Sequence, residues 1–321
     1  MGGVSKLIDH ALTPPGSPEL EVIIVTYGGP NMVRQCLTSL QMVADEVQGM
    51  VICVVDNASP DDTPKIVRDE FPGVRLYEQS YNSGFAVANN IALRRVTAPF
   101  ILVLNPDTQL AKGTLAHLVA QMRVETGIGV LGCRLVTATG NFDHAAKRSI
   151  PTPLDAATYF LSRLFPSFSS KYEAPQVGEH EKGQVDAVNG AFMLIRKTAL
   201  DQVGMLDERY WMYGEDMDWC VRFRQRGWQV AYDGRVTVLH LKGGSSGRRR
   251  HPQLNWHFHK SMFIFYRTHL AGKSAIVDCV VYAAIAVRCV VTTIGERTIS
   301  VIAPLTNVGR CLKGKLNAHR S

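Results

Sequence analysis

The first half of the chain alternates short apolar runs with segments of helical periodicity. Four runs rich in β-branched and aliphatic residues predict strands at Glu21–Tyr27, Met50–Asp56, Val74–Glu78 and Phe100–Leu104. Between and after them, apolar residues at helical spacing predict helices at Asn31–Ala44, Thr63–Glu70, Phe85–Val96 and Thr114–Glu125. Near-continuous apolar strands separated by helices are typical of a parallel sheet covered on both faces. Ligands of such sheets bind at the carboxyl ends of the strands.

From residue 130 onward the strands carry more polar interruptions. The patterns predict strands at Val130–Val136, Val185–Arg196, Gln229–Tyr232 and Val236–Leu239. They predict helices at Glu215–Arg226 and Trp256–Thr268. Residues 140–183 are rich in Pro, Ser and charge, which favours a loop-rich excursion with a short helix near Leu154–Leu164. We therefore expect an α+β second half, and the chain shows no internal repeat.

Length and composition fit one large domain with an appendage. The chain has 321 residues, of which 46% are hydrophobic and 20% charged, so wholesale disorder is not expected. We divide it into a flexible N-terminal lead (1–19), a main domain (20–270) and a C-terminal helical segment (271–321). The main domain divides further into a first half (20–126) and a second half (127–270).

The charge and the cysteines indicate a cytosolic protein that meets anions. The net charge is +7, with one cluster at Arg248–Arg250 and a basic tail at Arg310, Lys313, Lys315 and Arg320. Such clusters suit phosphates, anionic membrane surfaces or nucleic acid, although a solvated loop and tail have the same composition. The seven cysteines contain no C-x-x-C pair, which fits a reducing compartment. The first 20 residues lack the apolar region of a secretory signal.

Ala275–Ile294 is a strongly apolar stretch near the C-terminus. Asp278 and Arg288 interrupt it, and two charges in 20 residues disfavour a membrane span. The stretch is compatible with a buried helix, a homodimer-forming helix, or an interfacial helix assisted by the basic tail.

The segment from Trp211 to Arg222 holds three acids within four residues, Glu215, Asp216 and Asp218, among Trp, Met and Tyr. Carboxyl groups held against apolar surface have shifted proton affinities, which suits general acid or base catalysis. Asp218 is four residues before Arg222, the spacing of an ion pair along a helix.

Polar residues follow the predicted strands of the first half. Asp56 could accept a hydrogen bond from a nucleobase or ribose, or could form a turn. Asn82 and Gly84 precede a helix whose N-terminus could meet an anion, or could simply cap it. In Asn105-Pro106-Asp107, a carboxylate at a strand end could hold a divalent cation, or the three residues could form a type I turn.

Two glycine-rich segments need different interpretations. Gly127–Gly132 matches G-x-G-x-x-G, but it follows a helix and enters a strand, so we reject it as a dinucleotide site. Residues 240–250 combine His240, a glycine-rich loop and three arginines including Arg248. This composition favours a diphosphate-binding lid over a solvated surface loop.

Taken together, these motifs resemble family 2 glycosyltransferases with the GT-A fold over roughly residues 20–270. The resemblance rests on VIIVTY, VVDNAS, NSGFAVANN, LVLNPD, GAFMLIR, MLDERYWMYGEDMDWCVRFRQRGW and the late His240. Within this family, the chain most resembles bacterial rhamnosyltransferases that act on lipid-linked cell-wall intermediates. The implied fold is α/β, a doubly wound and mostly parallel sheet with an α+β acceptor half and C-terminal helices.

The resemblance also implies a role for each matching residue. Asp216 would be the catalytic base with Glu215 beside it, and Asp107 and His240 would hold Mg²⁺ or Mn²⁺. Asn105 departs from the acid that begins the family's metal motif. The residues implied in nucleotide-sugar binding are Thr26, Tyr27, Asp56, Asn82, Gly84, Asn105 and Arg248. Trp211 and Tyr213 are compatible with core packing or with stacking on the acceptor.

The implied reaction is inverting transfer of a sugar, L-rhamnose from dTDP-rhamnose, to a glycan or polyprenyl-diphosphate-linked acceptor. Alternatives are a hexosyl- or N-acetylhexosaminyltransferase using a UDP-sugar, a sugar nucleotidyltransferase, and a non-catalytic sugar-binding module. The region after the first strand lacks the basic phosphate loop expected of a nucleotidyltransferase. We expect a cytoplasmic protein, peripheral on the inner face of the membrane, with no nucleic-acid partner.

Overall fold

The chain divides into two compact units, residues 1–245 and 246–321. The computed structural model describes residues 6–8, 17–150, 174, 176–241, 252–272 and 274–294. The main domain predicted from the sequence ends at residue 270, and the first compact unit ends at Ser245. The predicted helix near Leu154–Leu164, the Arg248 loop and the basic tail lie outside the described residues.

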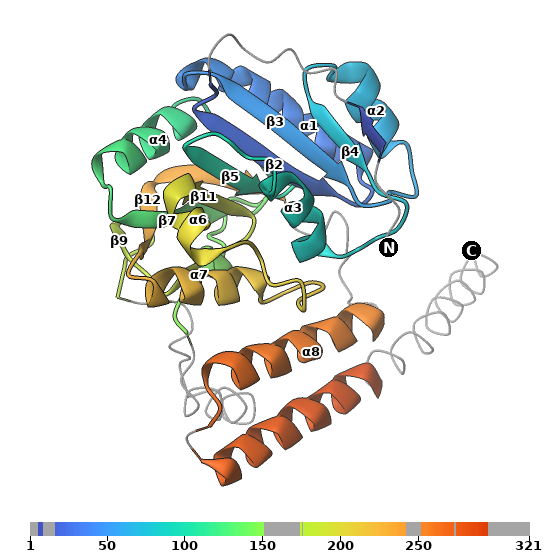
Figure 1. Ribbon diagram of the computed structural model, residues 1–321, viewed down its shortest axis with the longest axis vertical. Coiled ribbons are helices and arrows are strands. Elements are labelled where there is room, and N and C mark those ends of the chain that lie inside the picture. Colours follow the sequence, from blue (N-terminus) through green and yellow to red (C-terminus); the bar gives the residue numbers. More distant parts are fainter. Residues whose placement is uncertain are drawn as a thin grey trace, which may run out of the picture. The chain divides into compact units, whose positions relative to one another are not determined.

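A ten-stranded mixed sheet forms the centre of the first unit (Figure 1). Its main path runs β1 (Lys6–Ile8), β4 (Arg75–Glu78), β3 (Met50–Asp56), β2 (Leu20–Thr26), β5 (Phe100–Leu104), β11 (Phe192–Arg196), β7 (Ile128–Val136), β12 (Gln229–His240) and β6 (Thr108–Gln109). Strands β4, β3, β2 and β5 are parallel, as predicted, and all seven residues of β2 are buried. Beyond β5 the sheet becomes mixed, because β11 runs antiparallel to both its neighbours.

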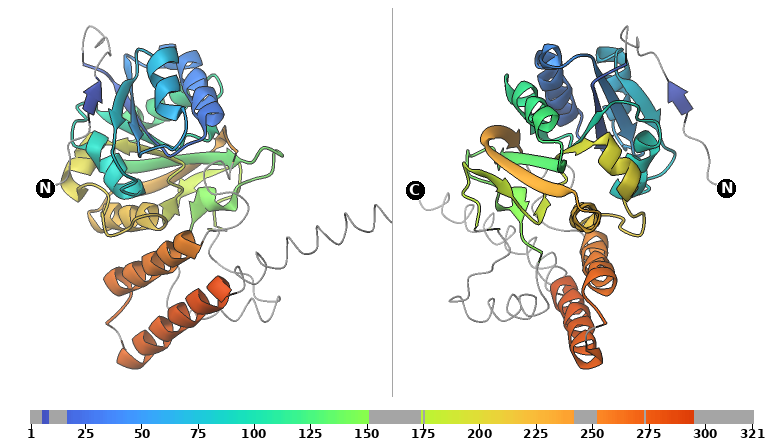
Figure 2. Two further views of the ribbon diagram at one scale, coloured as in Figure 1. Left: turned by 90° about the vertical axis from the view of Figure 1, so that its right-hand side faces the viewer. Right: turned by 60° about the vertical axis from the view of Figure 1, so that its left-hand side comes forward.

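Helices cover both faces of this sheet. They are α1 (Pro30–Met42), α2 (Thr63–Glu70), α3 (Phe85–Leu93), α4 (Thr114–Val124), α6 (Lys197–Val203) and α7 (Glu215–Gln225), with 3₁₀ turns at Ala44–Glu46 and His144–Ala146. Figure 2 shows α1 and α2 on one face and α3 on the other. In α1, Pro30 supplies a preset first turn, and Val33, Leu37 and Leu40 are buried. The predicted parallel sheet covered on both faces is thus confirmed for the first half.

Three short strands complete the second half of the unit. β9 (Lys182–Gln184) pairs with β12, and β8 (Lys147–Arg148) pairs with β10 (Ala187–Val188) in a separate two-stranded sheet. Ala187 lies opposite Arg148 in this small sheet. The pairing brings the chain after residue 140 next to the start of α7.

Two predicted strand boundaries were wrong. Residues 185–196 form two strands, β10 and β11, because a turn at Asn189–Ala191 separates them, with the Phe192 amide donating to the Asn189 carbonyl. Conversely, β12 is one strand, which an irregularity between Asp233 and Thr237 bends without breaking. As predicted, the Gly127–Gly132 segment enters a strand and opens no helix, since Ile128 begins β7, and Gly132 packs on Val188.

The second unit contains two described helices. These are α8 (Pro252–His269) and a helix at Ala275–Ile294, called here the apolar helix. Tyr266, Val281 and Ile285 are buried between them. Of the described residues, only the apolar helix is long and apolar enough to cross a membrane by length and composition.

Candidate active site

Asp56, the last residue of β3, is held rigidly at the carboxyl edge of the sheet. Its Oδ1 accepts hydrogen bonds from the Thr26 hydroxyl at 3.1 Å and the Ser59 hydroxyl at 2.5 Å. Its Oδ2 accepts from the Ser59 amide at 3.1 Å. A carboxylate offers about four acceptor positions, so Oδ2 can take one further donor. Tyr27, next in the chain after Thr26, is 44% exposed at the same edge.

The neighbouring strand end is organised by Asn57. Its side chain donates to Asn82 Oδ1 at 2.9 Å and accepts from the Ser83 amide at 2.9 Å. Asn82 Oδ1 also accepts from the Gly84 amide at 3.0 Å, so the turn before α3 is tightly fixed. Gly84 has φ of 87°, and a Cβ there would lie 2.5 Å from the Trp211 carbonyl oxygen. Only glycine therefore fits between α3 and the segment before α7.

Asp107 and His240 meet because β6 pairs with the end of β12, with His240 opposite Thr108. His240 Nε2 lies 3.4 Å from Asp107 Oδ1, and His240 Nδ1 lies 3.2 Å from Asp143 Oδ2. Burial lowers the pKa of His240, but the bonds to Asp107 and Asp143 outweigh it and raise the pKa to about 9. A carboxylate behind one ring nitrogen is the usual arrangement around a metal-binding histidine.

Asp107 retains capacity for a ligand. Its Oδ1 is buried and, within the described part of the chain, has His240 Nε2 at 3.4 Å but no hydrogen bond of ordinary geometry. No group of three His, Cys, Asp or Glu side chains that could hold a metal occurs among the described residues. Asp107 and His240 can therefore supply two ligands, and phosphate oxygens and water would have to supply the others.

Asp216, in the first turn of α7, is buried and held from three directions. Its Oδ2 accepts from the Arg148 guanidinium at 2.5 Å and from the Gly190 amide at 2.9 Å. Its Oδ1 accepts from the Met217 amide at 2.7 Å. Arg148 is itself buried and also donates to the Val188 carbonyl at 2.7 Å. This network fixes the direction of the Asp216 carboxylate.

Glu215 has a different environment although it is the adjacent residue. Its carboxyl group is buried, and Oε2 has no hydrogen-bond partner in the described residues. Burial, followed by the negative charge of Asp216, raises the pKa of Glu215 to about 8. Burial and the Asp216 charge therefore favour the protonated form of Glu215, which can donate a hydrogen bond.

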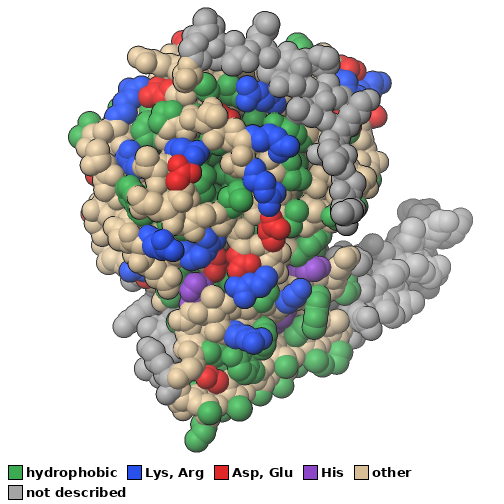
Figure 3. Space-filling view, viewed as in Figure 1, with side chains coloured by type: hydrophobic (Ala, Val, Ile, Leu, Met, Phe, Trp, Pro, Cys, Tyr) green, Lys and Arg blue, Asp and Glu red, His purple; other side chains and the backbone are tan. Residues whose placement is uncertain are grey.

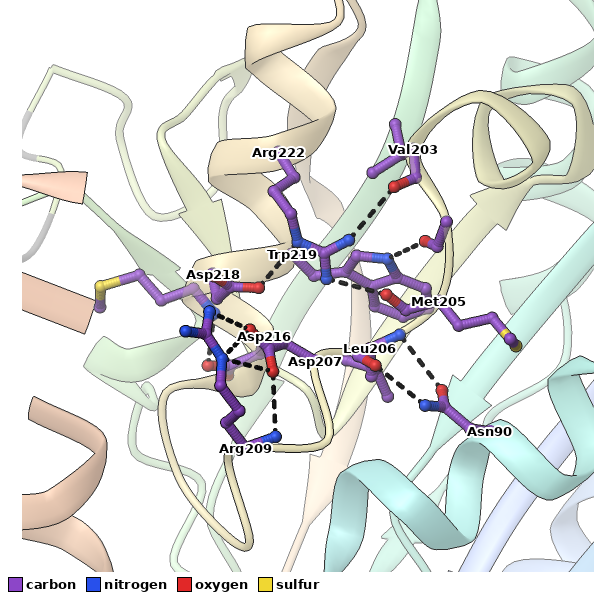
Figure 4. Close-up of polar contacts among 12 residues, drawn as sticks. Asn90, Val203, Met205, Leu206, Asp207, Arg209, Asp216, Asp218, Trp219 and Arg222 are labelled. Carbon is purple, nitrogen blue, oxygen red and sulfur yellow. Dashed lines mark hydrogen bonds and ion pairs between the residues drawn. The ribbon is translucent and has the colours of Figure 1, made fainter. Parts of the chain in front are cut away.

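The rest of the acidic motif anchors α7, as Figure 4 shows. Arg222 Nε donates to Asp218 Oδ2 at 2.8 Å, which confirms the predicted pair. Arg222 also donates to the carbonyls of Val203 and Met205, and Trp219 Nε1 donates to the Gly204 carbonyl. These contacts bind the start of α7 to the end of α6.

Trp211 and Tyr213 lie in the segment that enters α7. Both are half-buried, and the Trp211 carbonyl accepts from the Phe85 amide at 2.7 Å. Tyr213 has φ of 71°, an unusual conformation for a residue with a side chain, and Gly214 follows at φ of 82°. Left-handed backbone at a bulky residue costs about 1–3 kcal/mol and is enriched at ligand sites.

The turn Asn189–Ala191 lies between the Asn105-Pro106-Asp107 turn and the start of α7. The Asn105 amide donates to the Ala191 carbonyl at 3.0 Å, and the Gly190 amide donates to Asp216. Ala191 thus contacts the Asn-Pro-Asp turn, and its neighbour Gly190 contacts the candidate base. A side chain at Gly190 would contact Asp216 at 3.4 Å.

Sequence reasoning missed Arg148 and Asp143. Both lie in the segment interpreted as a loop-rich excursion, and their partners are 68 and 97 residues away in the chain. Isolated polar residues in such a segment carry no local signal. The predicted residues that the structure does bring together are Thr26 with Asp56, Asn82 with Gly84, Asp107 with His240, and Trp211 with Gly84.

Two curated relatives span most of this chain. It is 29% identical over 268 residues to an N-acetylglucosaminyl-diphospho-decaprenol L-rhamnosyltransferase of Mycobacterium tuberculosis, covering 79% of this chain and 85% of the relative. It is 24% identical over 249 residues to the rhamnosyltransferase WbbL of Escherichia coli, covering 75% of this chain and 90% of that protein.

Solved structures share the fold. The mannosyltransferase PcManGT from Pyrobaculum calidifontis, in complex with GDP-Man and Mn²⁺, matches with a TM-score of 0.55 at 19% identity, over 95% of this chain and 83% of that one. S. aureus TarS 1-349 in complex with UDP-GlcNAc matches with a TM-score of 0.52 at 18% identity, over 84% and 71% of the two chains. The predicted GT-A fold is thus confirmed.

The family model for glycosyl transferase family 2 matches residues 21–204, more than half of the chain. This match includes Asp56, Asp107, Arg148 and Gly190, and it ends before α7. The match supports a glycosyltransferase over the nucleotidyltransferase and the non-catalytic sugar-binding module named as alternatives from the sequence. The chain belongs to glycosyl transferase family 2 and is a glycosyltransferase.

Proposed function

We propose that the enzyme transfers L-rhamnose from dTDP-rhamnose, with inversion, to a hydroxyl of a glycan or polyprenyl-diphosphate-linked acceptor. The observation that carries the proposal is the Asn189–Ala191 turn, bonded both to Asn105 and to Asp216. Glycosyl transfer needs the donor diphosphate and the acceptor base on either side of one reacting carbon. Both rhamnosyltransferase relatives support the choice of sugar, and the name of the Mycobacterium tuberculosis relative supports a polyprenyl-diphosphate-linked acceptor.

Donor binding is assigned to the carboxyl edge of the sheet. The open acceptor position on Asp56 Oδ2 suits the imide N–H of a thymine or uracil base. Thr26 holds Asp56 in place, and exposed Tyr27 can cover the base. Asn82, Gly84 and Asn105 line the path toward the diphosphate, and Arg248, outside the described residues, stays a prediction for the same group.

A divalent cation, Mg²⁺ or Mn²⁺, fits Asp107 and His240. The fit rests on the buried Oδ1 of Asp107, which lacks a hydrogen bond of ordinary geometry, and on His240 Nε2 at 3.4 Å from it. Such ions keep several waters and bind through few carboxylates plus substrate phosphates, so two protein ligands suffice. When bound, the cation would neutralise charge on the departing diphosphate. Asp143 would orient His240 through Nδ1.

The chemical step uses the residues of α7. Asp216 accepts the proton of the acceptor hydroxyl as its oxygen attacks the anomeric carbon. The bond from that carbon to the diphosphate oxygen breaks, and its electron pair leaves with the nucleoside diphosphate. Attack opposite the leaving group inverts the configuration. Arg148 keeps Asp216 in position, and protonated Glu215 can donate a hydrogen bond to the acceptor.

The acceptor is assigned to the segment before α7. The half-buried rings of Trp211 and Tyr213 can stack on the apolar C–H face of a sugar. The left-handed backbone of Tyr213 supports this assignment, because such strain is retained where it serves a site.

A panel of nucleotide sugars tests the proposal. The full chain is mixed with Mn²⁺ and dTDP-rhamnose, UDP-glucose, UDP-galactose or UDP-N-acetylglucosamine, and thermal unfolding and transfer are measured. At 100 times its dissociation constant, a bound donor stabilises the native state by about 2.7 kcal/mol. We expect dTDP-rhamnose to give the largest shift, and EDTA to reduce it.

Two other outcomes would change the proposed donor or the proposed cation ligands. Stabilisation by a UDP-sugar alone would replace rhamnose with a hexosyl or N-acetylhexosaminyl donor, while leaving the transfer mechanism in place. Stabilisation by dTDP-rhamnose that is unchanged in excess EDTA would count against Asp107 and His240 as cation ligands.

A further inference from the structure

The apolar helix turns its polar groups toward α8. The Tyr266 hydroxyl donates to Asp278 Oδ1 at 2.7 Å, and the Gly272 amide donates to Asp278 Oδ2 at 2.9 Å. At the other end, Asn255 Nδ2 donates to the hydroxyls of Thr292 at 2.9 Å and Thr293 at 2.8 Å. Asp278, one of the two charges that disfavour a membrane span in the sequence, is therefore hydrogen-bonded inside the helix pair.

The opposite face of the same helix is exposed and apolar. Its exposed side chains recur every three or four residues and form one stripe, comprising Ile276, Val277, Cys279, Val280, Val287, Val290, Val291 and Ile294 with Ala275, Ala283 and Ala286. No charged residue of Ala275–Ile294 is exposed. Only 11% of the most apolar 18-residue stretch of this helix is buried. Figure 3 shows hydrophobic side chains at the surface of this part of the molecule.

This distribution differs from that in a water-soluble helix pair, because the outward face of the apolar helix is apolar as well as the face packed on α8. Soluble amphipathic helices bury the apolar face and expose the polar one. Helices in contact with lipid instead hydrogen-bond to one another through Ser, Thr and Asn and present apolar side chains outward. A protein interface would carry a polar rim around its apolar centre, whereas in Ala275–Ile294 every residue in the exposed class is apolar.

The charge of this unit complements an anionic surface. Residues 246–321 contain twelve Lys and Arg but two Asp and Glu, whereas residues 1–245 contain 23 and 26. On α8, Lys260 and Arg267 are exposed, and the helix contains no acid. Clustered basic residues beside an apolar surface are attracted to anionic lipid head groups. Trp256, which is 59% exposed, suits the same interface.

We propose that α8 and the apolar helix form a hairpin that lies in the plane of an anionic lipid bilayer. The stripe from Ile276 to Ile294 enters the boundary between head groups and acyl chains, and Lys260 and Arg267 contact the head groups. The hairpin lies flat because a spanning orientation would carry exposed Lys260 and Arg267 into hydrocarbon. This partner is independent of the donor sugar proposed above.

Vesicle flotation with the full chain tests the proposal. Vesicles of phosphatidylcholine alone are compared with vesicles containing 30% phosphatidylglycerol, a composition chosen for the assay. We expect flotation with the anionic vesicles and at least about a tenfold lower bound fraction for the double variant Val280→Glu, Val287→Glu. The matched control is Val124→Glu, at an 81% exposed valine ending α4, which should float like the unaltered chain. Circular dichroism checks that both variants fold.

Labelling of Cys279 supplies a second readout. This thiol is exposed on the stripe, whereas Cys36, Cys53, Cys133 and Cys220 are buried. A membrane-impermeant maleimide should label Cys279 in solution and label it several-fold more slowly with anionic vesicles, as read by mass spectrometry of its peptide.

Three outcomes would overturn the proposal. One is recovery of the unaltered chain in the unbound fraction with anionic vesicles. Another is equal flotation of the double variant and the control. The third is a dimer in solution in which Cys279 is already protected without vesicles, because the stripe would then be covered by a second copy of the chain.

Discussion

Glu215 and Asp216 are neighbours in sequence, yet their surroundings give them different chemistry. Asp216 is matched by Arg148 and by two backbone amides, so its charge is compensated. Glu215 has an unpartnered buried oxygen and a pKa raised to about 8 by burial and by Asp216. Environments that separate two carboxyl groups in this way distinguish a base from a proton donor.

The raised pKa of Glu215 predicts a pH-dependent stability. Between its ordinary pKa of 4.5 and about 8, folded Glu215 holds a proton that the unfolded chain has released. The free energy of unfolding therefore falls as pH rises through this window, by up to about 1.4 kcal/mol per pH unit. We expect Glu215→Gln to unfold at a higher temperature than the unaltered chain at pH 8, with a smaller difference at pH 5. Equal pH slopes for the two chains would contradict this, and Glu181→Gln, at an exposed carboxyl, is the control.

The ion pair between Arg148 and Asp216 leads to a second prediction at the scale of single residues. Arg148→Met leaves the buried carboxylate of Asp216 without its counter-charge, and such losses cost on the order of 3–5 kcal/mol. We expect urea denaturation to show this destabilisation and steady-state kinetics to show a lower kcat with donor KM little changed. Arg148→Lys should recover part of both. A stable, fully active Arg148→Met variant would show that Asp216 needs no positioning.

Single residues were predictable from sequence where their partner is close in the chain. Asp218 and Arg222 form the expected pair because four residues make one helical turn. Asp107 and His240 were associated only through the family resemblance. Arg148 and Asp143 were missed, because their contacts depend on the β8–β10 and β7–β12 pairings, which no local pattern encodes.

At the scale of elements, the join between α3 and the segment before α7 is built around Gly84. The residue has φ of 87° and ψ of 173°, and its Cα lies against Trp211. This join links the proposed nucleotide-binding edge to the proposed acceptor segment.

Gly84→Ala should disrupt that join. An added Cβ would lie 2.5 Å from the Trp211 carbonyl oxygen and 2.6 Å from its ring, and the backbone angle disfavours alanine. We expect a melting temperature lower by several degrees and weaker transfer. Gly113→Ala is the control, because it also has φ of 87° but has nothing within 4 Å of the added carbon. Equal losses in the two variants would assign the effect to backbone angle alone.

The positions of helices and strands could be predicted from the hydrophobic pattern, but the direction and continuity of the strands could not. The ranges of β3, α2 and β5 were predicted to the residue, since each is bounded by clear turn or cap residues. The antiparallel direction of β11 was not, because apolar runs have no direction. The break at Asn189–Ala191 was hidden within an apolar run, and the bend in β12 resembled a chain break.

At the scale of the whole molecule, the two units differ in how much core they hold. The first unit buries entire strands such as β2 and β5, whereas the buried cluster among the described residues of the second unit comprises Tyr266, Val281 and Ile285. Stability within a protein follows local burial, so the second unit should open more readily in solution.

Hydrogen exchange measures this difference. We expect backbone amides of residues 252–294 to exchange at least tenfold faster than those of β2 and β5. Anionic vesicles should slow exchange in residues 252–294 and leave β2 and β5 unchanged. Uniform protection of both units without vesicles would contradict the account.

The most direct test of the central claim is Asp216→Asn, measured for donor binding and for transfer in the same preparation. The amide keeps the size of the side chain but cannot accept the acceptor's proton. Loss of a general base costs about 10²–10⁴-fold in rate. We predict such a loss of transfer with thermal stabilisation by the donor retained, while Asp69→Asn on the exposed face of α2 changes neither. Transfer at the unaltered rate in Asp216→Asn would contradict the assignment of Asp216 as the catalytic base.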